Sequence, residues 1–291
     1  MSNPPRSTDR SRNSVQLTRR QWLAAAGVGI AGLTGVDARF VEPNRLTVSV
    51  HSVGKPNMTS RPFRLVQLSD LHLRGTTKRA ARVAATVAAL HPDHIVITGD
   101  AIDDAKNLGL LESFLDMLEA PVPKTAILGN WEHWAGINAA ALGRAYSRRD
   151  CNLLVNEPSE LSIGQRRLTL LGIDDFVGGH PNLETTMQRA TSASNSILLQ
   201  HCPAFRDTAT AIASSPRDGL RLMLSGHTHA GQFAPFGWAP LRPYGSGRYV
   251  QGWYRDENRW PLYVSRGIGT SIAPVRLFAP PEIAVFDLSL E

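Results

Sequence analysis

The sequence predicts an α/β protein in which strands and helices alternate along the chain and pack in layers. Three short apolar runs, at 63–69, 94–98 and 125–128, have the length and composition of strands. Apolar residues at helical spacing occupy the segments between them, at 77–90 and 107–119. This order of strands and helices is typical of a layered α/β domain.

The individual elements support this prediction. The run 94–98 is almost continuously β-branched, as in a sheet that is covered on both faces. Pro121 and Pro123 end the helix predicted at 107–119. The longest connection, 230–260, is rich in Gly, Pro, Trp, Tyr and Arg, and the two halves are expected to pack as one domain. Further strands are predicted at 167–172, 197–200, 221–225, 262–265 and 283–288.

The composition is that of a folded protein, with 42% hydrophobic and 19% charged residues. The net charge is +6, of which the first 38 residues contribute +3, through five arginines and two aspartates. No run of Lys and Arg with interleaved aromatic residues is present, so no nucleic-acid binding is inferred. Cys151 and Cys202 match no metal or redox motif, and two free thiols are favoured over a bridge between them.

The first 38 residues have the layout of a signal segment. A polar, Arg-rich start leads to Arg19-Arg20 and then to Trp22 and Leu23, which resembles a twin-arginine export signal. The apolar stretch 24–36 is short for crossing a bilayer. We therefore expect an exported protein, periplasmic or associated with the cell envelope, that engages the twin-arginine export machinery. Cleavage near Ala38 and retention as an uncleaved anchor both remain open, and the enzyme domain is expected at 39–291.

Metal-binding side chains follow several of the predicted strands. Asp and His occur two residues apart at one strand end, and two histidines have the same spacing at another, so each pair shares a side of an extended chain. Each position alone could be a turn or a helix cap, but turns have no need of four histidines. The full set is Asp70, His72, Asp100, Asn130, His201, His227 and His229.

The chemistry of these side chains indicates which metals they would bind. Four imidazoles with two carboxylates and an amide suit Mn, Fe or Zn, whereas Ca and Mg prefer oxygen ligands alone. The set is too large for one ion with open positions, so two divalent ions that share a carboxylate are predicted. Such a pair can clamp a phosphoryl group and lower the pKa of a water molecule between them.

The order Asp-x-His, Gly-Asp, Gly-Asn, His and Gly-His-x-His resembles the calcineurin-like metallophosphoesterases over residues 63–288. The segments 226–232 and 265–269 are similar to a branch of bacterial exported or membrane-associated phosphodiesterases. The resemblance implies an α/β fold of four layers, an αββα sandwich of two mixed sheets flanked by helices. It also implies a metal-dependent phosphoester hydrolase, a phosphodiesterase or phosphatase, that uses a hydroxide bridging the two ions.

The resemblance further assigns a role to each ligand. Asp70, His72 and His229 would hold the first ion. Asn130, His201 and His227 would hold the second, and Asp100 would bridge the two.

One position departs from the family pattern. The family usually has a histidine after the Gly-Asn pair, which assists the leaving group, and Trp131 stands there instead. A tryptophan cannot transfer the proton. We predict that His133 replaces this histidine if the segment is extended, with Glu132 as the less favoured alternative. A third alternative is that neither residue replaces it and that the enzyme prefers substrates with good leaving groups.

The substrate remains open at this stage. The segment 233–260 combines aromatic residues with arginines, which would suit a surface that meets lipid headgroups or cell-wall polymers, or would simply pack a long loop. Arg266 could bind a phosphate oxygen or serve the structure. The expected partner is a phosphoester substrate, from envelope lipid, cell-wall polymer or nucleotide, with peripheral membrane contact. Two alternatives are a UDP-sugar-lipid pyrophosphatase and a non-catalytic scaffold with the same fold.

Overall fold

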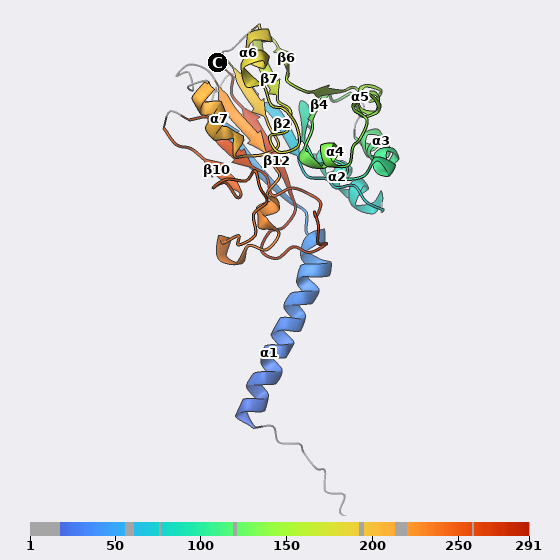
Figure 1. The fold of residues 1–291 in the computed structure, drawn as a ribbon, viewed down its shortest axis with the longest axis vertical. Coiled ribbons are helices and arrows are strands. Elements are labelled where there is room, and N and C mark those ends of the chain that lie inside the picture. The colour runs from blue at the N-terminus through green and yellow to red at the C-terminus, as the bar shows by residue number, and fades with distance from the viewer. Residues whose placement is uncertain are drawn as a thin grey trace, which may run out of the picture.

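A computed structural model describes residues 18–55, 61–75, 77–118, 121–191, 195–212, 220–257 and 259–290. The start of the predicted signal segment, residues 1–17, lies outside this part of the chain. Figure 1 shows a rounded domain from which one long helix projects.

The first sheet has six strands in the order β1-β12-β2-β3-β4-β5. The strands β2, β3, β4 and β5 run parallel to one another, whereas β12 pairs antiparallel with β2 and parallel with β1. Their bounds are Thr47–Val53 for β1, Phe63–Leu68 for β2, His94–Thr98 for β3, Lys124–Ile127 for β4, Cys151–Leu154 for β5 and Glu282–Leu288 for β12.

The second sheet also has six strands, in the order β10-β11-β9-β8-β7-β6. The strands β7, β8, β9 and β11 are parallel, and the antiparallel strands β6 and β10 form the two edges. Their bounds are Glu157–Ile163 for β6, Arg166–Gly172 for β7, Ser196–Leu199 for β8, Arg221–Ser225 for β9, Gly252–Tyr254 for β10 and Leu262–Val264 for β11.

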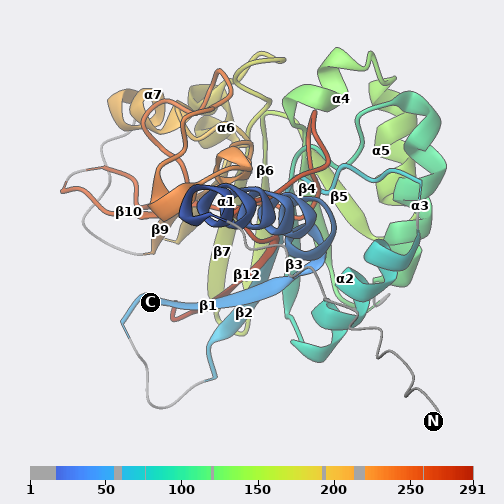
Figure 2. The ribbon, with the colours of Figure 1, turned by 90° about the horizontal axis from the view of Figure 1, so that it is seen from below.

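Helices cover the outer face of each sheet (Figures 1 and 2). On the first sheet lie α2 (Thr77–Ala89), α3 (Leu108–Met117) and α5 (Ala139–Ser147), and on the second lie α6 (Leu183–Arg189) and α7 (Phe205–Ile212). Alternation along β2 shows how the core divides, because Leu65 faces the second sheet while Val66 and Leu68 face the helices. The predicted four-layer αββα sandwich of two mixed sheets is confirmed.

The predicted strands and the two predicted helices are all present, with ends that differ by a few residues. The strands β1, β5, β6 and β10 were not predicted. β1 and β6 lie at sheet edges, and their residues alternate between half-buried and exposed, so they lack the apolar runs that mark the central strands. A short helix, α4 (Asn130–Trp134), occupies the segment that follows β4.

The N-terminal helix α1 (Arg19–Val36) begins at Thr18, whose hydroxyl accepts the backbone N–H of Gln21. It continues into two short helical turns, Asp37–Val41 and Glu42–Asn44. The 26 residues from Arg19 to Asn44 are long and apolar enough to cross a membrane, a property that signal sequences share. This helical segment is longer than the apolar stretch 24–36 on which the prediction of a signal segment rests. No residue of α1 is buried.

Candidate metal centre

Every predicted metal ligand follows a parallel strand at the same edge of the sandwich. Asp70, Asp100 and Asn130 come after β2, β3 and β4 of the first sheet. His201 follows β8, and the pair His227 and His229 follows β9 of the second sheet. Because the carboxyl ends of parallel strands meet at one edge, residues 159 positions apart in the chain, Asp70 and His229, become neighbours. All seven predicted ligands are buried there together.

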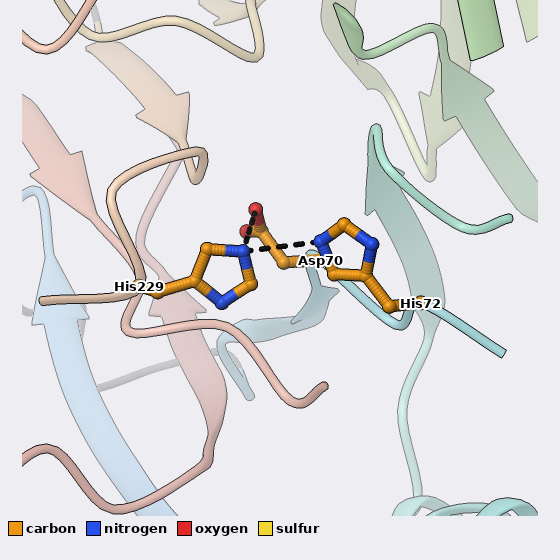
Figure 3. Close-up of side chains that lie close together, drawn as sticks. All are labelled: Asp70, His72 and His229. Carbon is orange, nitrogen blue, oxygen red and sulfur yellow. Dashed lines mark hydrogen bonds and ion pairs between the residues drawn. The ribbon is translucent and has the colours of Figure 1, made fainter. Parts of the chain in front are cut away.

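The first group of ligands consists of Asp70, His72 and His229 (Figure 3). The Nε2 atoms of His72 and His229 lie 3.1 Å apart, and Oδ1 of Asp70 lies 3.3 Å from Nε2 of His229. Three donor atoms therefore converge on one point. Burial, together with His72 and Arg276, lowers the pKa of His229 well below its usual value, which favours the neutral imidazole that a metal requires.

The second group consists of Asp100, His201 and His227. Oδ2 of Asp100 lies 3.0 Å from Nε2 of His201. The amide oxygen of Asn130 lies 2.9 Å from Nδ1 of His227, which adds a fourth donor to this group.

Asp100 connects the two groups. Its Oδ2 atom also lies 3.8 Å from Nε2 of His72, a member of the first group. Its other oxygen, Oδ1, accepts the backbone N–H of Trp131 at 3.0 Å. The carboxylate thus has the position that a shared ligand needs.

The imidazole of His201 and the carboxylates around it are suited to binding a cation. Nδ1 of His201 lies 2.7 Å from the carbonyl oxygen of Thr98 and can only donate to it, so the lone pair of the neutral ring is on Nε2. That Nε2 atom is buried and faces two carboxylates, with Oδ2 of Asp100 at 3.0 Å and Oδ1 of Asp70 at 4.0 Å. Burial opposes protonation of His201, but the carboxylates of Asp100, Asp70 and Asp175 raise its pKa well above the usual value. The carboxylates of the centre therefore favour a positive charge at this position.

The backbone of the centre is held in an unusual conformation. Five of the seven predicted ligands have positive φ angles, between 41° and 74°: Asp70, His72, Asp100, His227 and His229. Residues with side chains rarely adopt this region, and it occurs preferentially at functional sites. A Cβ atom on Gly226 would lie 2.2 Å from Oδ2 of Asp70, so only glycine allows this approach.

Several supporting side chains were not predicted. Oγ of Ser69 donates to Asp70 at 2.6 Å, and Oδ2 of Asp103 lies 3.6 Å from Nδ1 of His72. The buried Arg276 donates to the carbonyls of Gly267 and Gly269, and its Nη2 atom lies 3.3 Å from Nδ1 of His229. Ser69 precedes a ligand and could have been suspected, but Asp103 and Arg276 belong to no recognisable motif.

A cavity of about 470 Å³ opens onto the centre. Asp100, Asn130, His227 and His229 lie at its base. Much of the remaining wall is apolar and comes from Trp131, Trp134, Leu241, Pro243, Ile272 and Ala273, with Arg242 as a cationic side chain. This volume suits a small-molecule headgroup.

The segment that holds Trp131 and His133 is not extended, as the prediction for His133 assumed, but helical. Two residues along a helix correspond to a rotation of about 200°, so side chains two positions apart lie on nearly opposite sides of the helix. Trp131 lines the cavity, whereas Nε2 of His133 lies 2.7 Å from Oδ1 of Asp174, which raises the pKa of His133.

Glu132, the alternative to His133, accepts backbone N–H groups of Gly129, Asp100, Ala101 and Ile102. Burial and the nearby Asp100 raise its pKa to about 7. These bonds tie the loop after β3 to α4, which is a structural role.

The structure also shows where the aromatic residues of 233–260, Arg266 and the two cysteines lie. In the 233–260 segment, Tyr249 and Trp260 are buried in the core, whereas Trp238 and Tyr244 are exposed. The guanidinium of Arg266 donates to Pro280 and Thr47, which serves the structure. Cys151 and Cys202 are both free, as predicted, and both are buried.

Comparison with known proteins places these features in a family. Residues 63–231 match the family described as calcineurin-like phosphoesterase. The metallophosphoesterase YkuE of Bacillus subtilis is 33% identical, over 94% of this chain and 98% of its own. The phosphodiesterase YaeI of Escherichia coli is 27% identical, over 94% and 99%. A bovine (Bos taurus) transmembrane protein with metallophosphoesterase domain is 30% identical, over 92% of this chain and 62% of its own.

Proposed function

This chain belongs to the calcineurin-like phosphoesterase family of metal-dependent enzymes, and from that membership we propose that it hydrolyses phosphoesters at a centre of two divalent metal ions. The observation that carries the proposal is the buried convergence of two ligand groups, linked by Asp100. Phosphodiesters are the first candidates, because the relative YaeI is named a phosphodiesterase.

In this proposal, Asp70, His72 and His229 hold one ion, and Asn130, His201 and His227 hold the other. Asp100 lies between them and is shared. The four imidazoles favour Mn, Fe or Zn. When bound, the ions supply Lewis-acid polarisation of the phosphoryl group and activation of water.

The chain itself contributes orientation and an apolar surrounding. The backbone N–H groups of Trp131 and His227 donate to Asp100 and Asp70, respectively, and fix the two carboxylates. Nδ1 of His201 is held by the carbonyl of Thr98. Trp131 and Trp134 line the cavity and reduce the access of water to a bound phosphoester.

Hydrolysis of two chromogenic substrates tests this proposal. With Mn²⁺ added, we expect turnover of bis-p-nitrophenyl phosphate to exceed that of p-nitrophenyl phosphate, and a chelator should abolish both. An Asp100→Asn variant serves as the matched control, because it keeps the shape of the side chain and removes the shared charge. The proposal fails if neither substrate is turned over with Mn²⁺, Fe²⁺ or Zn²⁺.

The role of His133 in protonating the leaving group stays a prediction, and the helical conformation counts against it, because His133 is not among the residues that line the cavity. The hydrogen bond to Asp174 favours the protonated imidazole, which a general acid needs. A His133→Ala variant should then be slowed by about 10²-fold or more on an alkyl phosphodiester. It should be much less affected on an aryl diester, whose leaving group needs no proton. An unchanged rate on the alkyl substrate would exclude the role.

We also propose that the protein is exported, and the support comes from the N-terminal sequence and from α1. The paired arginines 19 and 20 stand in the first turn of α1, directly after its cap Thr18. No residue of this helix is buried, as expected for a segment that contacts an export machinery or a bilayer. We propose that the domain acts in the cell envelope, on the far side of the cytoplasmic membrane.

A further inference from the structure

Large apolar side chains are exposed around the mouth of the metal cavity. Ile272 is 88% exposed and Leu241 is 72% exposed, and both line the cavity. Trp238, which is 67% exposed, is three residues from Leu241 on the same loop. We call this set, together with Phe40, Phe233 and Phe278, which are also exposed, the apolar rim. Large apolar side chains exposed on neighbouring loops can mark a binding surface.

The apolar rim is continuous with the base of α1. The backbone N–H of Arg276 donates to the carbonyl of Ala38 at 2.9 Å, and the Glu42 carboxylate accepts the N–H groups of Phe278 and Ala279. Phe233 pairs with Leu277, so the loop after β9 adjoins the same segment. These bonds join the segment after α1 to the loops that carry the cavity mouth.

Figures 1 and 2 show the same relation at larger scale. The orange and red loops that follow β9 and β11 gather at the end of the domain from which α1 projects. Since the helical segment 19–44 is long and apolar enough to cross a bilayer and α1 has no buried residue, a bilayer around α1 would lie against this end of the domain.

The charges near α1 also suit a membrane surface. A second cavity, of about 430 Å³, is lined by Pro43 and Asn44 of the segment after α1 and by Lys78, Arg79 and Arg82. Arg82 donates to the carbonyl of Asn44. Three cations beside the helix that would enter the bilayer are complementary to anionic headgroups.

We propose that the apolar rim docks onto an anionic phospholipid bilayer, anchored there by α1, and that the centre hydrolyses the phosphoester of a membrane amphiphile. The substrate class rests on the proposed phosphoesterase function, whereas the docking surface does not. The headgroup would enter the cavity from the membrane, between Leu241 and Ile272, while the apolar part stays in the bilayer.

Single fluorophores test the docking surface directly. Cys151 and Cys202 are buried, so a maleimide fluorophore should label only an introduced cysteine. The full chain with Ile272→Cys is reconstituted into vesicles of phosphatidylglycerol and phosphatidylethanolamine that carry a lipid-borne quencher. The matched control is Ile212→Cys at the end of α7, an exposed isoleucine outside the apolar rim.

We expect strong quenching by the lipid-borne quencher at position 272 and none at 212. Equal quenching at the two positions would overturn the proposal. A fluorophore at 272 that is shielded from both the lipid quencher and aqueous iodide would identify a second copy of the chain as the occupant, and would overturn it as well.

Kinetics test the substrate class. We compare hydrolysis of a phosphodiester headgroup in the same vesicles with hydrolysis of soluble bis-p-nitrophenyl phosphate. The double variant Trp238→Ser, Phe278→Ser changes rim residues that do not line the metal cavity. Its rate on the vesicle substrate should fall by about tenfold or more, and its rate on the soluble substrate should not change.

An equal effect on both substrates would contradict the proposed substrate class, as would hydrolysis of the soluble substrate alone by the wild type. If the wild type hydrolyses neither the vesicle substrate nor the soluble substrate, the phosphoesterase function itself is refuted. The fluorophore result would then stand on its own.

Discussion

Asp103 illustrates how a single carboxylate outside the ligand set orients a ligand. Its Oδ2 atom lies 3.6 Å from Nδ1 of His72, and Arg74 pairs with the same oxygen. Burial opposes ionisation of Asp103, but the nearby His72 and the ion pair with Arg74 lower its pKa. An imidazole that offers Nε2 to a metal carries its proton on Nδ1, and a carboxylate there holds the ring in place. We assign Asp103 the role of a positioning residue for His72.

An Asp103→Asn variant should therefore weaken metal binding by about 10- to 100-fold while the fold is retained. Metal affinity of the chelator-treated protein is the measurement, with circular dichroism as a check on the fold. Asp104→Asn is the matched control, since Asp104 is an exposed neighbour that pairs with Lys106. Equal affinities for the two variants would show that Asp103 has no part in the metal centre.

At the scale of elements, β3 shows that the two ends of one strand perform different tasks. Asp100 follows its carboxyl end and belongs to the proposed metal centre, whereas His94 stands at its amino end in the core. Nε2 of His94 lies 2.9 Å from Oγ1 of Thr125 on the neighbouring strand, β4. Burial and the nearby Lys124 lower the pKa of His94 from 6.5 to about 4. The strand therefore contains a neutral histidine far from the reaction.

This pKa shift makes stability depend on pH. Between about pH 4 and 6.5 the unfolded chain binds a proton at His94 that the folded chain does not, so the free energy of unfolding falls as the pH decreases through this range. The contribution is on the order of 2–3 kcal/mol. In His94→Gln, the decrease in denaturant midpoint from pH 6.5 to pH 4 should be smaller than in the wild type. Parallel curves for both proteins would refute this account.

At the scale of the whole molecule, the sequence was sufficient to predict the central strands and which side chains gather in the candidate metal centre. Strands such as β3 are continuous apolar runs, and each ligand directly follows such a run. The edge strands β1 and β6 lack this pattern, because their residues are half-buried or exposed and none is fully buried. Contacts such as Asp103 with His72 depend on loop conformations that no local pattern encodes.

The helical segment α4 is a second case in which the local sequence pattern does not predict the conformation, here next to the predicted ligand Asn130. The Gly-Asn pair predicted a ligand there, but the local conformation depends on Glu132, which binds backbone N–H groups of two separate loops. Only the assembled sandwich brings these loops together. The position of α1 beside the cavity mouth likewise depends on the backbone hydrogen bond from Arg276 to Ala38, two residues that are 238 positions apart in the chain.

The most direct test of the two-metal centre is a titration of the chelator-treated full chain with Mn²⁺. Bound metal is counted while hydrolysis of bis-p-nitrophenyl phosphate is followed, and electron paramagnetic resonance reports whether the bound ions are coupled. We predict two ions per chain, a coupled signal that Asp100→Asn abolishes, and activity that rises with occupancy of the second ion. Binding of a single uncoupled ion at full activity, or hydrolysis that persists without metal, would contradict the account.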